Sequence, residues 1–358
     1  MENKPVLEPL EQRVLLSGGV FGEALDVETP YANTIEKGGF SYDGENGRVD
    51  VKLKGPGEGS WELDEDGRLY VNLMNTTRRT SFNVIGEADI KKFKSDGNLG
   101  LFNAKSSNLE GKFEAENIRE FRVYDILEEA NVLTGDIGRF LANNLSGKYS
   151  LFNVRTFLVN GDVNSADIFV EKANSLKISG NTLDSLILSF DDIGHSNFAG
   201  DFVDSAIISF DKISLARIDG DFINSSVSSG ELARFQVNGN TSDSKLESDR
   251  IVSANLSGDV LNGSISSDYI GRVNIGGNFA GSKVYSEKIT SFSISGDITN
   301  SSLFSDYLGT AVVGGDVKDS DLTFDKIVSA NIGGDLVNSS VFAYSDISKV
   351  EAIKVKNK

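Results

Sequence analysis

The fold is decided by a stretch that begins at Gly258, ends at Gly276 and reads GDVLNGSISSDYIGRVNIG. A Gly-Asp pair opens it, a short apolar strand follows, and Asp268 marks an acidic turn. After that turn, Val273 and Ile275 alternate with polar residues. Period-two alternation is typical of a β-strand with one buried face. The stretch therefore predicts two short strands separated by tight turns.

The same pattern recurs through most of the C-terminal part of the chain. Gly followed by Asp or Asn opens ten successive units, and consecutive units lie 19 or 20 residues apart. The opening glycines are Gly161, Gly180, Gly200, Gly220, Gly239, Gly258, Gly277, Gly296, Gly315 and Gly334. Units of this kind stack on one another because none can bury a core alone. The sequence therefore predicts an all-β, single-stranded β-solenoid with coils of 19–20 residues. Because these coil lengths do not divide by six, we expect a right-handed parallel β-helix.

Equivalent apolar positions in successive units predict three ladders that face inward. The first contains Ile213, Leu232, Ile251, Ile270, Ile289, Leu308 and Ile327. The second contains Ala216, Phe235, Ala254, Val273, Phe292, Ala311 and Ala330. The third contains Ile218, Val237, Leu256, Ile275, Ile294, Val313 and Ile332. Adjacent coils are expected about 4.8 Å apart, which is the normal strand spacing.

The Gly-Asp pair itself has a backbone explanation. We expect the glycine to supply a positive φ at each turn and the Asp or Asn to bond to nearby backbone. Turn chemistry thus accounts for the row Asp201, Asp221, Asp259, Asp297, Asp316 and Asp335 without any ligand.

Upstream of the regular units, four segments can be distinguished. Residues 1–20 form a motif segment and 21–39 a linker. Residues 40–85 alternate around a hairpin signal at Asp66-Gly67 and predict an antiparallel β cap. Residues 86–358 are predicted to form the solenoid. Ile90-x-x-Phe93 is expected to be an early copy of the strand that recurs at Ile118, with an inserted or degenerate coil between them.

Composition excludes several functions. The formal net charge of −18 argues against binding to nucleic acid, which requires clustered Lys and Arg. The absence of Cys and the single histidine, His195, exclude disulfides, cysteine-ligated metals and multi-histidine metal sites. The sequence contains no apolar run of 18 residues, so no transmembrane helix is predicted.

The N-terminal segment LEPLEQRVLLS, residues 7–17, resembles the LEPR-XLL motif of large bacterial surface proteins. The matching residues are Leu7, Glu8, Pro9, Arg13, Leu15, Leu16 and Ser17; Leu10-Glu11-Gln12 interrupts the strict pattern. The Gly-Asp coils are similar to the β-solenoids of those proteins and of haemagglutinin-like adhesins. These resemblances imply export to the cell surface or the medium, and they carry no binding residues over.

An acidic row offers the one candidate metal site. Its members lie two residues before the strand-opening apolar residue in successive units: Asp191, Asp211, Asp249, Asp268, Glu287, Asp306 and Asp325. Carboxylates one strand spacing apart repel by ~0.9 kcal/mol even in bulk water. Bridging Ca²⁺ would relieve this repulsion, and so would side chains that spread into solvent. No complete calcium-loop motif occurs, so a solvated face is the favoured interpretation and no cofactor is predicted.

The expected function is that of a structural or adhesive protein without catalytic activity, exported, and in contact with glycan, matrix or other cell-surface components. The alternative is a β-helix lyase or hydrolase acting on an acidic polysaccharide. Such an enzyme needs a groove of Asp, Arg and Lys walled by loops, and coil lengths between Gly161 and Gly334 leave no room for long loops. A groove of this kind near residues 95–150 would favour the enzyme. His195 is interpreted as an exposed strand residue.

Overall fold

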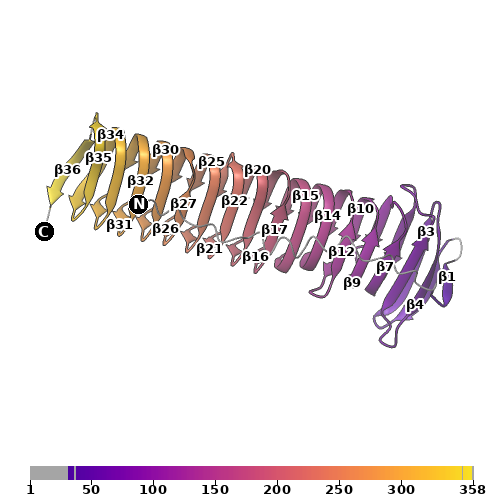
Figure 1. Cartoon of the computed structure of the whole chain (residues 1–358). Helices are drawn as coiled ribbons and strands as arrows, with labels where there is room; N and C mark the ends of the chain where they lie inside the picture. The colour runs from indigo at the N-terminus through magenta and orange to yellow at the C-terminus, as the bar shows by residue number, and fades with distance from the viewer. Residues whose placement is uncertain (1–30, 36–37, 349, 357–358) are drawn as a thin grey trace.

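The computed structural model describes residues 31–35, 38–348 and 350–356. The motif predicted at residues 7–17 lies outside them. The described chain contains no helix, about 70% of the residues are in strands, and the strands stack into about 14 coils. Figure 1 shows the coils side by side along one axis, with the N-terminal strands at one end and the C-terminal strands at the other. The predicted all-β solenoid is confirmed.

The coil that opens at Gly258 shows how the chain is wound. It contributes β26 (Val260–Leu261), β27 (Ser264–Ser266) and β28 (Tyr269–Ile275). These strands pair in parallel with β29 (Phe279–Ala280) and β30 (Lys283–Ile294) of the next coil. The pairing is in register, because each residue lies beside its equivalent 19 positions later, as in the pair Val273 and Phe292.

The three predicted inward ladders are confirmed. Every one of their members is buried, and none is more than 7% exposed. Ile218 pairs with Val237, and Leu256 pairs with Ile275. The core is therefore a continuous column of stacked side chains along the shaft.

Toward the N-terminus the column becomes aromatic. Phe82, Phe102, Phe121, Phe140 and Phe157 pair in register in successive coils. Their rings stack nearly parallel, with centroids 4.3–5.9 Å apart. Phe113 meets this stack edge-on, 4.8 Å from both Phe102 and Phe121. Offset and edge-to-face contacts add about 0.5–1.5 kcal/mol per pair beyond burial.

The register predicted around Ile90 is wrong. Ile90 and Phe93 on β7 (Asp89–Ser95) pair with Leu109 and Phe113 on β9 (Asn108–Ala115). The strand that recurs at Ile118 has its earlier neighbour at Leu99 instead. The two motifs look alike because both are inward-facing strands, but they lie on different faces of the coil. The long interval between them therefore needs no insertion.

The antiparallel cap is present, and its hairpins cover the first coil. The cap strands are β1 (Asn33–Ile35), β2 (Phe40–Gly44), β3 (Gly47–Lys54) and β4 (Glu58–Leu63). The rings of Phe40 and Trp61 stack with centroids 3.9 Å apart. Parallel pairing starts before the predicted boundary at residue 86. The strands β5 (Leu69–Met74) and β6 (Ser81–Ile85) each pair antiparallel with the cap on one edge and parallel with the coils on the other.

The explanation predicted for the Gly-Asp pair is wrong in part, because none of the ten opening glycines has a positive φ. They are needed for space: a Cβ on Gly220 would lie 2.7 Å from the backbone carbon of Gly200 in the preceding coil. The positive φ belongs to the residue four positions later. In eight coils this residue is Asp184, Asp204, Asn224, Asp243, Asn262, Asn300, Asp319 or Asn338, with φ between 45° and 53°; in the other two it is Ser165, with φ 52°, and Gly281, with φ 60°.

Two polar ladders hold these turns together. The backbone N–H of Asp221 donates to Oδ1 of Asp201 at 2.8 Å, and the same bond repeats between the coils up to Asp335. Inside the turn, the N–H of Ser205 donates to Oγ of the buried Ser225 at 3.0 Å. The Asp residues of the Gly-Asp pairs therefore act as turn residues, as predicted.

Candidate functional site

The predicted acidic row is mostly a solvated edge. Asp249, Asp268, Glu287, Asp306 and Asp325 are all exposed. Buried serines of the following coil fix the backbone at this turn. Ser267 Oγ donates to the carbonyl oxygen of Asp249 at 3.2 Å, and Ser286 Oγ to that of Asp268 at 3.3 Å. These bonds use the backbone carbonyl and not the carboxylate, so the acidic side chains face water.

A row of charged residues and aromatic rings lies beside the acidic row along the chain. Glu231, Arg250, Tyr269, Lys288 and Tyr307 pair in register in successive coils. The Arg250 guanidinium lies 4.6 Å from the centre of the Tyr269 ring, and Lys288 Nζ lies 5.5 Å from that of Tyr307. Cation–π contacts of this kind contribute about 0.5–1 kcal/mol at exposed sites. The sequence interpretation missed this row.

The row is interrupted at one coil. Ser229 and Leu232 pair with Ser209 and Ile213 of the preceding coil. Between Ser229 and Leu232 the chain has only Gly230 and Glu231. Gly230 therefore stands where Asp249 stands in the next coil, and Asp211 has no acidic neighbour on that side.

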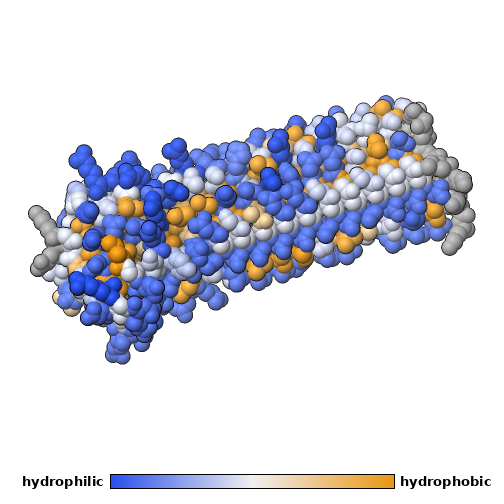
Figure 2. Space-filling view, turned by 180° about the vertical axis from the view of Figure 1, so that it is seen from behind, coloured by the Kyte–Doolittle hydropathy of each residue, from blue (hydrophilic) through white to orange (hydrophobic). Residues whose placement is uncertain are grey.

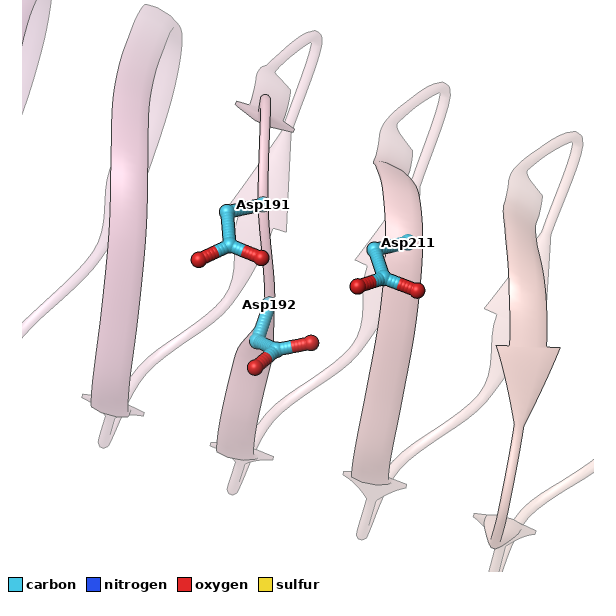
Figure 3. Close-up of side chains that lie close together, drawn as sticks. All are labelled: Asp191, Asp192 and Asp211. Carbon is cyan, nitrogen blue, oxygen red and sulfur yellow. The ribbon is translucent and has the colours of Figure 1, made fainter.

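The two longer coils bring three carboxylates together. Three residues lie between Ser189 and Ile193, where later coils have two. Ligand oxygens of Asp191, Asp192 and Asp211 lie within 4.8 Å of one another, which makes them the one group of three potential metal ligands among the described residues. Figure 3 shows the three side chains on two neighbouring coils.

The chain supplies its own cation at this acidic cluster of Asp191, Asp192 and Asp211. Lys172 Nζ lies 2.7 Å from Asp192 Oδ2 and 3.1 Å from Asp191 Oδ2. Hydrogen bonds to Asp192 and then to Asp191 raise the pKa of Lys172. The ammonium group thus already neutralises part of the negative charge that Ca²⁺ would neutralise. The solvated face stays the favoured interpretation of the row, with calcium binding as its alternative.

The extra residue in each longer coil is an exposed aromatic one. Phe190 and Phe210 are 41% and 56% exposed, and their rings stack with centroids 5.8 Å apart. Further along the shaft, Tyr285 and Phe304 form a second exposed pair with centroids 6.4 Å apart. On the face drawn in Figure 2, small hydrophobic patches recur along a mostly polar shaft. The one-residue change in coil length was the signal that could have revealed the first pair.

His195 is an exposed residue on β18 (Ile193–Phe198), as predicted. It pairs in register with Ser175 and Leu215, and neither neighbour is acidic. Its position gives no support to a catalytic role.

The stacked coils define the protein as a parallel β-solenoid with an antiparallel N-terminal cap. Comparison of the chain with protein-family models, curated proteins and solved structures gave no match. Within the described part of the chain, no helix is long and apolar enough to cross a membrane.

Proposed function

We propose that the protein works outside the cytoplasm as a non-catalytic solenoid, with a structural or adhesive role at the cell surface. The exposed aromatic pairs along the shaft carry this proposal. Phe190 stacks on Phe210 and Tyr285 lies beside Phe304, and all four are more than 40% exposed. Solubility does not require exposed aromatic rings, and hydrophobic patches rimmed by polar residues are typical of contact surfaces.

Localisation tests the proposal. The full-length chain with a C-terminal tag should appear in the medium, or should be degraded by a protease added to intact cells. A tag that stays protected until the cells are lysed would contradict it.

A matched pair of variants tests the role of the rings. The double variant Phe190→Ser, Phe210→Ser should keep its melting midpoint but bind isolated cell-surface material less well. Val252→Ser, which removes a single exposed apolar side chain, serves as control. Equal binding by both variants and the parent protein would rule out the Phe190–Phe210 pair as the contact.

A second candidate is a β-helix enzyme that acts on an acidic polysaccharide. A hollow of about 370 Å³ lies between Arg78, Arg119 and Asp136, in the region where such a groove was expected. Two arginines suit a uronate substrate, but Asp136 is the one carboxylate among the lining residues, and its Oδ1 accepts a hydrogen bond from Asn153 at 2.8 Å. One engaged carboxylate is a weak basis for acid–base chemistry.

Incubation with acidic polysaccharides decides between the two. The non-catalytic proposal predicts no new chain ends. Release of chain ends that is lost in Arg119→Ala would establish the enzyme instead.

A further inference from the structure

A second hollow, larger than the one beside Arg119, lies where the cap meets the first coils. It has a volume of about 780 Å³, and we call it the cap groove. Its walls come from Tyr42 on β2, the turn Asp66–Arg68, Asp89 on β7, Asn108 and Glu110 on β9, and Tyr124. Ligand sites in proteins usually have volumes of about 300–1,000 Å³. The cap groove is therefore large enough for a short oligosaccharide.

Tyr42, one of the lining residues, carries a polar group that the described chain leaves unused. Its hydroxyl oxygen is buried and makes no hydrogen bond within the described chain. Burial, and then the nearby negative charge of Asp89, raise the pKa of Tyr42 to about 12. The phenol thus keeps its proton at neutral pH and is available as a donor. A buried hydroxyl without a partner is costly, so such groups point to a missing partner.

The other polar groups are held in place by the fold. Asp89 Oδ1 accepts a hydrogen bond from Asn108 Nδ2 at 3.0 Å, across the pair of β7 and β9. Arg68 is fixed by Asp64 at 2.8 Å and by Asp66 at 2.7 Å. Both the donors and the acceptors that sugar hydroxyls need are therefore preorganised.

Tyr124 adds an aromatic surface. It is 48% exposed and lines the same groove, so its ring is accessible to a ligand. Apolar faces of sugar rings pack on exposed aromatic rings of this kind, whose large area adds binding energy.

The charge of the groove narrows the ligand class. Among the lining residues, five are acidic and two are basic: Glu45, Asp66, Glu87, Asp89 and Glu110 against Arg68 and Lys105. The two basic residues do not outweigh the five carboxylates, so uronate, sulfate and phosphate groups would be repelled. Neutral sugars and amino sugars meet no such penalty.

We propose that the cap groove binds a short stretch of a non-acidic polysaccharide, composed of neutral or amino sugars, with Tyr124 under a sugar ring and Tyr42 donating to a hydroxyl. This inference rests on the proposed binding function and names its ligand class. It places sugar recognition at the N-terminal end of the rod, separate from the exposed aromatic pairs on the shaft.

The single tryptophan of the chain reports on the groove. Trp61 lies 6.1 Å from the Tyr42 ring. Titration of the full-length protein with oligomers of N-acetylglucosamine, glucosamine and galacturonic acid, followed by tryptophan fluorescence and calorimetry, tests the proposal. We expect saturable binding of at least one of the first two oligomers and none of galacturonic acid.

Variants locate the binding site. Tyr42→Phe and Tyr124→Ala should each weaken binding about tenfold, which corresponds to about 1.4 kcal/mol. Val312→Ala, on the shaft and 47% exposed, should bind like the parent protein. Thermal melts confirm that each variant is folded.

Three results would overturn the inference: no binding of either non-acidic oligomer, tighter binding of galacturonic acid, or unchanged affinity in both tyrosine variants. The proposed function is judged separately by localisation. If the protein is exported but the groove binds no sugar, only this inference is contradicted. If the protein binds the sugar but stays in the cytoplasm, only the proposed function is contradicted.

Discussion

At the scale of single residues, each turn of the solenoid divides its conformational demands between two positions. The opening glycine provides space, because the backbone of the preceding coil lies against it, and the residue four positions later, in most coils Asn or Asp, takes the left-handed conformation. Asn and Asp tolerate that region better than other residues with a side chain. The two positions should therefore respond differently to substitution.

Gly220→Ala should destabilise the protein by about 1–3 kcal/mol, because its Cβ would collide with the backbone of Gly200. Asn300→Gly should change the free energy of unfolding by less than about 1 kcal/mol, since glycine relieves the positive φ but gains entropy in the unfolded chain. Urea unfolding of both variants measures the difference. Equal losses would contradict this division of roles.

The environment of Glu110 predicts how the stability of the folded protein depends on pH. Burial, and then the charge of Asp89, raise its pKa in the folded protein above the usual value of 4.5. The folded state then holds a proton that the unfolded state has released, so stability falls as pH rises from 4.5 through the raised pKa. Glu110→Gln removes this loss. Relative to the parent, the variant should therefore gain stability between pH 4 and pH 7, by less than about 1 kcal/mol because the side chain is only partly buried. A gain that is equal at both pH values would refute the shift.

The sequence allowed the identity of these turn residues to be predicted, but not their division of roles. A glycine that is required for positive φ and one that is required for space look the same in a single sequence. The difference depends on how closely the coils approach each other, and this becomes visible only when Gly200 and Gly220 lie side by side. The cap groove, with Tyr42 in its wall, was also not predicted, because its lining residues come from five separate segments that only the fold brings together.

At the scale of elements, the regular strands were predictable and the irregular turns were not. Alternation identified the inward ladders of the shaft, because parallel in-register pairing repeats the same side-chain direction in every coil. It misplaced Ile90, since a strand on one face of a coil has the same pattern as a strand on another. The acidic row was predicted from the sequence. The grouping of three carboxylates in the longer coils, each of which contains one additional residue (Phe190 or Phe210), was not.

Calcium dependence is the prediction that belongs to this acidic cluster. Because Lys172 bridges Asp191 and Asp192, we expect the melting midpoint of the parent protein to be the same with chelator and with millimolar Ca²⁺. Lys172→Met removes the ammonium group and should make the midpoint rise when Ca²⁺ is added. A calcium-dependent rise in the parent that is lost in Asp192→Asn would show that a metal, rather than Lys172, holds the cluster together.

At the scale of the whole molecule, the solenoid is a rod with one end closed by antiparallel hairpins (Figure 1). The strands β5 and β6 pair with the cap on one edge and with the coils on the other, so the cap covers an edge that would otherwise be open. Open parallel edges recruit other chains. The position of the cap was predictable from the hairpin at Asp66-Gly67, whereas the switch in strand direction inside it was not.

Removal of the cap should expose this edge. A truncated protein that begins at Gly86 is expected to associate end to end and to lose the N-terminal coils to proteolysis first. Light scattering after gel filtration and limited proteolysis measure the two effects. A truncated protein that remains a monomer at high concentration would show that the cap is dispensable.

Distances between labels along one outward row test the parallel stack most directly. Ser226, Lys245, Ser264, Lys283 and Ser302 pair in register on successive coils, and the chain has no cysteine to interfere with labelling. Cysteine pairs carrying spin labels at Ser226 and Ser264, and at Ser226 and Ser302, should be separated by about 10 Å and about 19 Å, because each coil adds about 4.8 Å. Separations that do not increase in proportion to the number of coils would contradict the stacked solenoid.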